Sequence, residues 1–180
     1  MKIAITGHTS GIGKSCFDLL SSKHNVFGYS RSNGWDISNI EMICQDLIHN
    51  DFDIVINNAY FEDCQVKILQ RMYEEWKNTN KKIISMGSVV TDHLHFTSKD
   101  GEDYTLYKRM LEDAHNRRTV GNTCQSILVK PAQVDTPLMR EDNVQTILSP
   151  LEVANVIEFI INSPENVYVS QLTVWPKKSV

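Results

Sequence analysis

The first 15 residues constrain the fold of this chain more than any other stretch. Lys2–Thr6 is a short, mainly apolar run, which is typical of a buried strand. The turn Gly7–Gly13 follows with three glycines, and Lys14–Ser22 has the character of a helix. Glycines permit a tight turn close to a pyrophosphate, and a helix N-terminus presents free N–H groups and the positive end of its dipole. This order of elements therefore predicts a nucleotide-binding site.

P-loop proteins share this outline, so they are the first alternative to weigh. A P-loop has glycine, four residues, and then Gly-Lys-Ser/Thr. Gly13–Ser15 matches the end of that motif, but the residue five before Gly13 is His8 rather than glycine. P-loop proteins also place an acidic residue for magnesium after a later strand, whereas the apolar run Asp53–Ile56 continues into Asn57. A P-loop nucleotide hydrolase is therefore the weakest of our three hypotheses.

The spacing in Thr6–Gly13, Thr-Gly-x-x-x-Gly-x-Gly, also differs from the usual dinucleotide fingerprint Gly-x-Gly-x-x-Gly. It resembles the short-chain dehydrogenase/reductase family. The resemblance implies an α/β fold with a Rossmann-type doubly wound parallel sheet, formed by residues 1–180 as a single domain. It also implies that the turn binds a dinucleotide through Gly7, Thr9, Ser10, Gly11, Ile12 and Gly13.

Composition limits the possible partners. The 180 residues are 41% hydrophobic and 22% charged, as in ordinary globular domains. With a net charge of −4, the chain lacks the basic footprint of a nucleic-acid-binding protein. No apolar run reaches membrane-spanning length and no signal peptide is recognisable, so we expect no membrane partner. Four widely spaced cysteines without a Cys-x-x-Cys motif favour reduced thiols in a cytoplasmic protein.

Short apolar runs and helical stretches alternate along the rest of the chain. The expected strands are Val26–Tyr29, Asp53–Asn57, Lys82–Met86, Ser126–Lys130 and Val167–Val174. The expected helices are Ile40–Asn50, Cys64–Asn78, Asp103–Arg117 and Pro150–Ile161. Continuous apolar strands alternating with helices predict a parallel sheet covered on both faces. Ligands of such folds bind beyond the carboxyl ends of the strands.

The end of the second strand bears on cofactor choice. An arginine at this position accommodates the 2′-phosphate of NADP, whereas an acidic residue binds the 2′-hydroxyl of NAD. Arg31 therefore favours NADP(H) over NAD(H). In the resembled family an Asp and an aliphatic residue then contact the adenine, which assigns Asp36 and Ile37 here; Asp36 is equally suited to a helix cap. Only Ser32–Trp35 separates these motifs, so the chain looks shortened at this point.

Two further segments resemble the family and imply cofactor contacts. Asn57, Asn58 and Ala59 match three positions of the family's Asn-Asn-Ala-Gly, and Tyr60 replaces the glycine. The resemblance implies that Asn57 bridges adjacent strands and the adenine side of the cofactor.

The second segment follows the fifth expected strand from the N-terminus. Pro131–Thr136 resembles the family's Pro-Gly-x-Val-x-Thr, with Ala132 in place of glycine. The resemblance implies that Pro131 belongs to the cofactor site. Backbone at Val134 would meet the nicotinamide carboxamide, and Thr136 would bind the carboxamide or a phosphate.

Three residues resemble the family's catalytic set. Ser88 follows a strand, and Tyr104 and Lys108 are four apart on a helix, so they project from one face. A phenol has a pKa near ~10, and a nearby ammonium lowers it. Tyr104 would then be the general acid/base, Lys108 would lower its pKa and hold the ribose, and Ser88 would fix the substrate oxygen. Ser85 is expected inside the strand instead.

The Tyr-Lys spacing also occurs at Tyr73 and Lys77, with two acids between them, which we interpret as helix surface. The family's catalytic Asn has no clear counterpart, and Gln65 or Asn78 are candidates to replace it. His93 and His95 have no matching Cys/His pair, so no metal is expected.

The remaining expectations concern two loops and the oligomeric state. Met139–Ser149 is short and polar where the family places a substrate lid. His8 could lie near phosphate, without a catalytic role. Family members commonly pair through the helices that correspond to Cys64–Asn78 and Asp103–Arg117, which implies a homodimer or homotetramer.

Two leading functional hypotheses follow. The first is an NADP(H)-dependent oxidoreductase that interconverts a carbonyl and an alcohol on a small substrate. The second is a dinucleotide-binding sensor or structural protein with little or no turnover. The complete Ser-Tyr-Lys order favours the first, and the missing Asn favours the second.

Overall fold

A six-stranded parallel sheet forms the centre of the molecule in a computed structural model that describes residues 1–92, 99–118, 123–137, 147–164 and 166–177. The strands are β1 (Lys2–Thr6), β2 (Asn25–Tyr29), β3 (Ile54–Asn57), β4 (Lys82–Met86), β5 (Gln125–Pro131) and β6 (Gln171–Val174). Their order is β2-β1-β3-β4-β5-β6, and every pairing is parallel. The chain thus moves from β1 to one neighbour, β2, and returns to the other, β3, which opens a crevice at their carboxyl ends.

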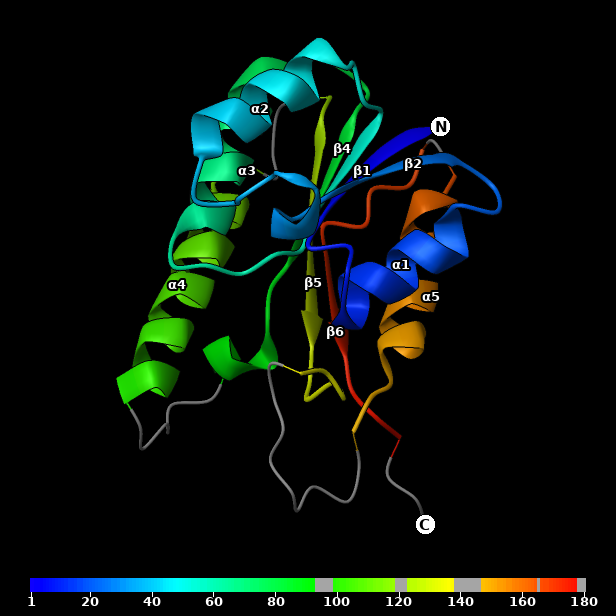
Figure 1. Ribbon diagram of the computed structural model, residues 1–180. Coiled ribbons are helices and arrows are strands. Elements are labelled where there is room, and N and C mark those ends of the chain that lie inside the picture. Colours follow the sequence, from blue (N-terminus) through cyan, green and yellow to red (C-terminus); the bar gives the residue numbers. More distant parts are fainter. Residues whose placement is uncertain (93–98, 119–122, 138–146, 165, 178–180) are drawn as a thin grey trace.

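Helices cover both faces of this sheet (Figure 1). They are α1 (Gly11–Leu20), α2 (Ile40–His49), α3 (Cys64–Trp76), α4 (Lys99–Asn116) and α5 (Pro150–Ile161). α1 and α5 pack on one face, and α2, α3 and α4 lie on the other. The expectation of a Rossmann-type doubly wound parallel sheet is confirmed. None of the described helices is long and apolar enough to cross a membrane.

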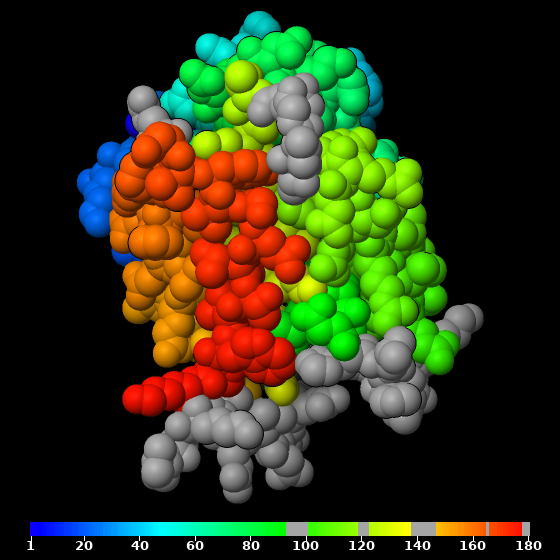
Figure 2. Space-filling model, turned by 180° about the vertical axis from the view of Figure 1, so that it is seen from behind, coloured from blue at the N-terminus to red at the C-terminus, as the bar shows by residue number. Residues whose placement is uncertain are grey.

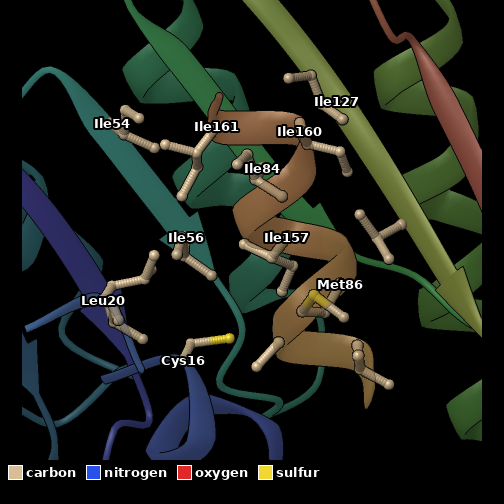
Figure 3. Close-up of a cluster of buried hydrophobic side chains, with 14 of the residues drawn as sticks. Cys16, Leu20, Ile54, Ile56, Ile84, Met86, Ile127, Ile157, Ile160 and Ile161 are labelled. Carbon is tan, nitrogen blue, oxygen red and sulfur yellow. The ribbon is translucent and has the colours of Figure 1, made fainter. Parts of the chain in front are cut away.

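Side chains point alternately to the two faces of the sheet and fill a hydrophobic core on each face. Ile54 and Ile56 of β3 and Ile84 of β4 point toward α5, where Ile157 meets them (Figure 3). Val55 lies between the two β3 isoleucines and faces α3. Because successive side chains point to opposite faces, the continuous apolar runs bury both sides of the sheet.

At the β2 edge the chain follows the expected pattern, whereas at the β6 edge the last strand begins later than predicted. Between β2 and α2 the only regular structure is a short 3₁₀ helix, η1 (Arg31–Asn33), so the chain is shortened there as expected. No further strand among the described residues follows β2 on that side, and β2 is therefore the edge strand of the sheet. At the other edge β6 begins at Gln171 rather than Val167, because the Val167 N–H instead donates to the Pro164 carbonyl at 2.9 Å in a turn. Figure 2 shows β6 (red) on the surface beside α5 (orange).

Two helices begin earlier than their apolar patterns predict. α1 starts at Gly11 instead of Lys14, since Ser10 is extended and forms the N-cap. α4 starts at Lys99 instead of Asp103. The early start of α1 matters for the site, because it brings the first helical N–H groups into the glycine turn.

Candidate active site

A single large cavity of about 1120 Å³ lies at the carboxyl ends of β1, β3, β4 and β5 in the described part of the molecule. It exceeds the ~300–1,000 Å³ that one drug-sized ligand usually occupies. Most residues that the sequence nominated line it: Gly7, Thr9, Ser10, Gly11, Ile12, Arg31, Asp36, Ile37, Asn58, Ala59, Ser88, Tyr104, Lys108, Pro131, Val134 and Thr136. The exceptions are Gly13 and Asn57, which lie behind the wall.

Close backbone packing shapes the glycine turn. Gly7 has φ +73°, a conformation that favours glycine. A Cβ on Gly13 would lie 2.1 Å from the Gly7 carbonyl oxygen, so helix α1 approaches the turn more closely than any side chain allows. A Cβ on Gly11 would lie 3.1 Å from Thr136 Cγ2. Gly13 therefore permits this packing and lies outside the cavity wall, and its predicted contact with a cofactor stays a prediction.

Asn58, rather than Asn57, ties the first two central strands together. The Asn58 side chain donates to the Thr6 carbonyl at 3.0 Å, and the Asn58 N–H donates to Thr6 Oγ1 at 3.0 Å. Asn57 is completely buried and donates to the backbone carbonyl of Gln65 at 2.8 Å. Asn57 therefore lies outside the cavity wall, because its position in β3 points its side chain at α3, and its predicted contact with the cofactor stays a prediction.

His8 also departs from expectation. Its ring packs on Phe17 with centroids 5.2 Å apart and lies directly against Gly28 of β2. The residue is absent from the cavity wall. The turn directs the His8 ring away from the cavity and back onto the sheet.

The end of the cavity beside β2 is suited to an adenosine. Arg31 and Asp36 lie there as predicted, and Asp36 Oδ1 accepts hydrogen bonds from the N–H and hydroxyl of Ser38 at 2.9 and 2.8 Å. These bonds hold the pKa of the Asp36 carboxyl below its usual value. Trp35 also lines this end and packs edge-to-face on Tyr29 at 5.1 Å. Trp35 was not among the predicted site residues, although it stands directly before the Asp36-Ile37 pair in the sequence.

The opposite end brings together the predicted Ser-Tyr-Lys set. Ser88 follows β4, and Tyr104 and Lys108 project from α4 into the same cavity. The Tyr104 hydroxyl forms a side-chain hydrogen bond with Ser88. Ser85 lies within β4 and is buried, as expected.

Lys108 is held by a network that crosses three elements. Its Nζ donates to Gln65 Oε1 on α3 at 2.7 Å and to the Met86 carbonyl on β4 at 2.7 Å. Gln65 Nε2 in turn donates to the Asn57 carbonyl at 2.8 Å and to the Met86 carbonyl at 3.3 Å. Gln65, rather than the exposed Asn78, thus occupies the position beside the lysine.

Burial dominates the electrostatics of this end. Desolvation lowers the pKa of Lys108 to about 7. Burial also raises the pKa of Tyr104, and the hydrogen bond from Ser88 opposes that rise. Burial is the largest influence on the Tyr104 pKa and Ser88 is the group that opposes it, so the lowering of this pKa by Lys108 stays a prediction. Tyr104 is a protonated phenol at neutral pH.

The remaining sequence candidates lie elsewhere. The Tyr73 hydroxyl donates to the Arg118 carbonyl at 2.7 Å and its ring is buried, so the Tyr73–Lys77 pair is partly core and lies away from the cavity. Lys14 pairs with Asp18 on the exposed side of α1. The described residues contain no cluster of three or more metal-ligating side chains. His93, His95 and most of Met139–Ser149 lie outside the described residues.

Comparison with solved structures identifies this architecture. An alcohol dehydrogenase from the archaeon Thermococcus sibiricus, complexed with 5-hydroxy-NADP, matches with a TM-score of 0.73 and 17% identity over 97% of this chain and 96% of that one. A 3-alpha-hydroxysteroid dehydrogenase from Pseudomonas sp. B-0831, complexed with NADH, matches with a TM-score of 0.77 and 18% identity over 97% and 95%. The chain has the fold of the short-chain dehydrogenases and reductases.

A third solved structure has the same fold. A short-chain dehydrogenase/reductase from Vibrio parahaemolyticus matches over 98% of this chain and all of that one, with a TM-score of 0.74 and 17% identity. No protein-family model and no curated protein matches this sequence. At such low identity the likeness to solved structures establishes the fold, and the activity must be argued from the residues in the cavity.

Proposed function

We propose that the protein is an NADP(H)-dependent oxidoreductase that interconverts a carbonyl and an alcohol on a small substrate. The observation that carries this proposal is the meeting of Ser88, Tyr104 and Lys108 in the same cavity as the glycine turn. A protein that only binds a dinucleotide has no need for a phenol hydrogen-bonded to a serine beside a buried lysine. Several solved structures with this fold were crystallised with NADP, NADPH or NADH.

The residues of the cavity fit a dinucleotide. The close packing at Gly13 leaves the N-terminus of α1 open to the cavity, where backbone N–H groups suit a pyrophosphate. Arg31, Val134 and Thr136 all line the cavity. Arg31 would supply a charge for a 2′-phosphate, and Val134 and Thr136 would bind the carboxamide. When bound, the nicotinamide supplies or accepts the hydride.

The chain's own residues then handle the proton and the substrate oxygen. Ser88 binds that oxygen and orients the Tyr104 hydroxyl. Tyr104, protonated at neutral pH, donates its proton to a carbonyl oxygen as negative charge develops there. Lys108 stabilises the resulting phenolate, and Gln65 fixes the lysine in place.

Parallel titrations with NADPH and NADH, followed by tryptophan quenching, test the proposal together with Tyr104→Phe. We expect NADPH to bind more tightly than NADH. Tyr104→Phe should keep NADPH affinity and lose about 10²–10⁴-fold in the rate of carbonyl reduction, because the general acid is gone. The absence of binding by either cofactor would refute the proposal.

The second candidate is a dinucleotide-binding sensor with little turnover. It is favoured by the pKa of Lys108, about 7, because the ammonium is partly lost at neutral pH. It is also favoured by Tyr60, which places an aromatic ring in the position where the resembled motif has glycine. A Tyr104→Phe variant indistinguishable from wild type in every assay would support this candidate.

We also propose a homodimer or homotetramer in the cytoplasm. Leu106 and Met110, one turn apart on α4, are 52% and 40% exposed, which leaves an apolar strip on the helix expected to mediate pairing. All four cysteines are buried free thiols, as suits a reducing compartment. A monomeric mass by light scattering would contradict the assembly.

A further inference from the structure

Tyr60 occupies an unexpected position in the cavity. It follows β3 and Ala59, in the place where the resembled motif ends in glycine, and it lines the cavity wall. Its ring meets the Tyr104 ring edge-to-face, with centroids 4.9 Å apart and an interplanar angle of 70°. This geometry is favourable for aromatic pairs, because the positive edge of one ring meets the negative face of the other.

The same ring lies close to the amine of Lys108. Nζ of Lys108 is 5.4 Å from the Tyr60 ring centroid and 5.3 Å from that of Tyr104. An ammonium has three N–H donors, and Gln65 and the Met86 carbonyl accept two of them. The two rings flank the lysine amine, and aromatic rings attract a cation.

Tyr60 therefore contacts both members of the Tyr-Lys pair from the loop after β3. We propose that Tyr60 is a positioning residue whose ring restrains the Tyr104 side chain and stabilises the Lys108 ammonium. This inference rests on the proposed function, since it assigns Tyr60 a part in supporting Tyr104 and Lys108. It concerns the ring and not the hydroxyl: burial raises the pKa of Tyr60 to about 12, so this phenol stays neutral beside Tyr104.

Three variants separate the possible roles of this side chain. Tyr60→Leu removes the ring and keeps apolar bulk, and Tyr60→Phe keeps the ring and removes the hydroxyl. Tyr107→Leu removes a ring from the same helix as Lys108, outside the cavity wall, and is the matched control. Far-UV circular dichroism establishes that each variant is folded.

The first readout is NMR of protein labelled with ¹³C-tyrosine, where the Tyr104 signal is assigned by its loss in Tyr104→Phe. We expect Tyr60→Leu to move the Tyr104 ring signals, because the neighbouring ring current is lost. Tyr60→Phe and Tyr107→Leu should leave them in place. Unchanged Tyr104 signals in Tyr60→Leu would overturn the proposed contact, whether or not a substrate has been found.

The second readout is the reduction of benzaldehyde with NADPH. We expect Tyr60→Leu to lower kcat about tenfold with KM changed less than twofold, and Tyr60→Phe to match wild type. A rise in KM alone would make Tyr60 a wall of the substrate site, and a loss in Tyr60→Phe would assign the role to the hydroxyl; either result overturns the proposal. Full activity in Tyr60→Leu with an inactive Tyr104→Phe refutes only the role of Tyr60, whereas full activity in Tyr104→Phe refutes the proposed function itself. If benzaldehyde is not reduced by wild type, the NMR result decides the question.

Discussion

At the glycine-turn end of the cavity the wall is mainly backbone, whereas at the Tyr104 end buried side chains form it. The first end depends on missing Cβ atoms, because α1 and β3 approach the turn at backbone distance. The second end depends on a closed set of hydrogen bonds among Gln65, Lys108 and the Met86 carbonyl. Substitutions that add atoms should therefore damage the glycine-turn end, and substitutions that remove polar atoms should damage the Tyr104 end.

The largest effect is expected from Gly13→Ala. Its Cβ would lie 2.1 Å from the Gly7 carbonyl oxygen and 2.5 Å from Asn58 Nδ2, so the turn must move. We expect a loss of about 3 kcal/mol in the free energy of unfolding and no measurable NADPH binding. Urea unfolding and tryptophan quenching measure both. As a control, Gly34→Ala meets no atom within 4 Å and should cost only about 1 kcal/mol, for its positive φ.

Gln65→Leu tests the side-chain end. It removes one of the two hydrogen-bond acceptors of the Lys108 amine and the side-chain donor to the Asn57 carbonyl, which should lower the free energy of unfolding by about 2 kcal/mol and reduce turnover. Adenosine 2′,5′-bisphosphate binds only at the adenosine end, so its affinity should be unchanged. Gln70→Leu, at an exposed position of the same helix, is the control. Equal loss of bisphosphate affinity would show that the two ends are not independent.

The next prediction concerns His115, a buried base that lies outside the cavity wall. Burial lowers the pKa of His115 on α4 to about 4, and its Nδ1 is 3.0 Å from Ser126 Oγ. The folded state holds it neutral, so between pH 6.5 and about 4 only the unfolded state takes up the proton and stability falls. We expect His115→Gln to remove about 2 kcal/mol of this acid sensitivity. Urea unfolding at pH 7 and pH 4 measures it, and exposed His49→Gln should change nothing.

The smallest effect concerns cofactor choice. Arg31 is exposed at the end of the cavity beside β2, so the interaction that we propose for it with a 2′-phosphate would be partly screened. We expect Arg31→Ala to weaken NADPH binding about tenfold, or about 1.4 kcal/mol, and to leave NADH binding within twofold. The ratio of the two dissociation constants is the measurement. An equal loss for both cofactors would remove the argument for NADP(H).

Much of the architecture was readable from local patterns. The run Lys82–Met86 and the helix Pro150–Ile161 have the bounds that apolar periodicity and the proline at a first turn predict. The glycine spacing and the four-residue step from Tyr104 to Lys108 likewise predicted which groups meet in the cavity. These features are local, since backbone conformation and side-chain direction repeat every two or 3.6 residues.

Only the tertiary structure decided which groups touch and how they are charged. It chose Gln65 as the partner of Lys108, gave Asn58 rather than Asn57 the place in the cavity, and set Tyr60 against Tyr104. It also buried the Tyr104 phenol, which raises the pKa of that group. The physical reason is that burial and hydrogen-bond partners depend on atoms brought from distant parts of the chain, such as Gln65 and Lys108, 43 residues apart. The sequence by itself determined the layers and the location of the cavity, and long-range packing determined the chemistry of its walls.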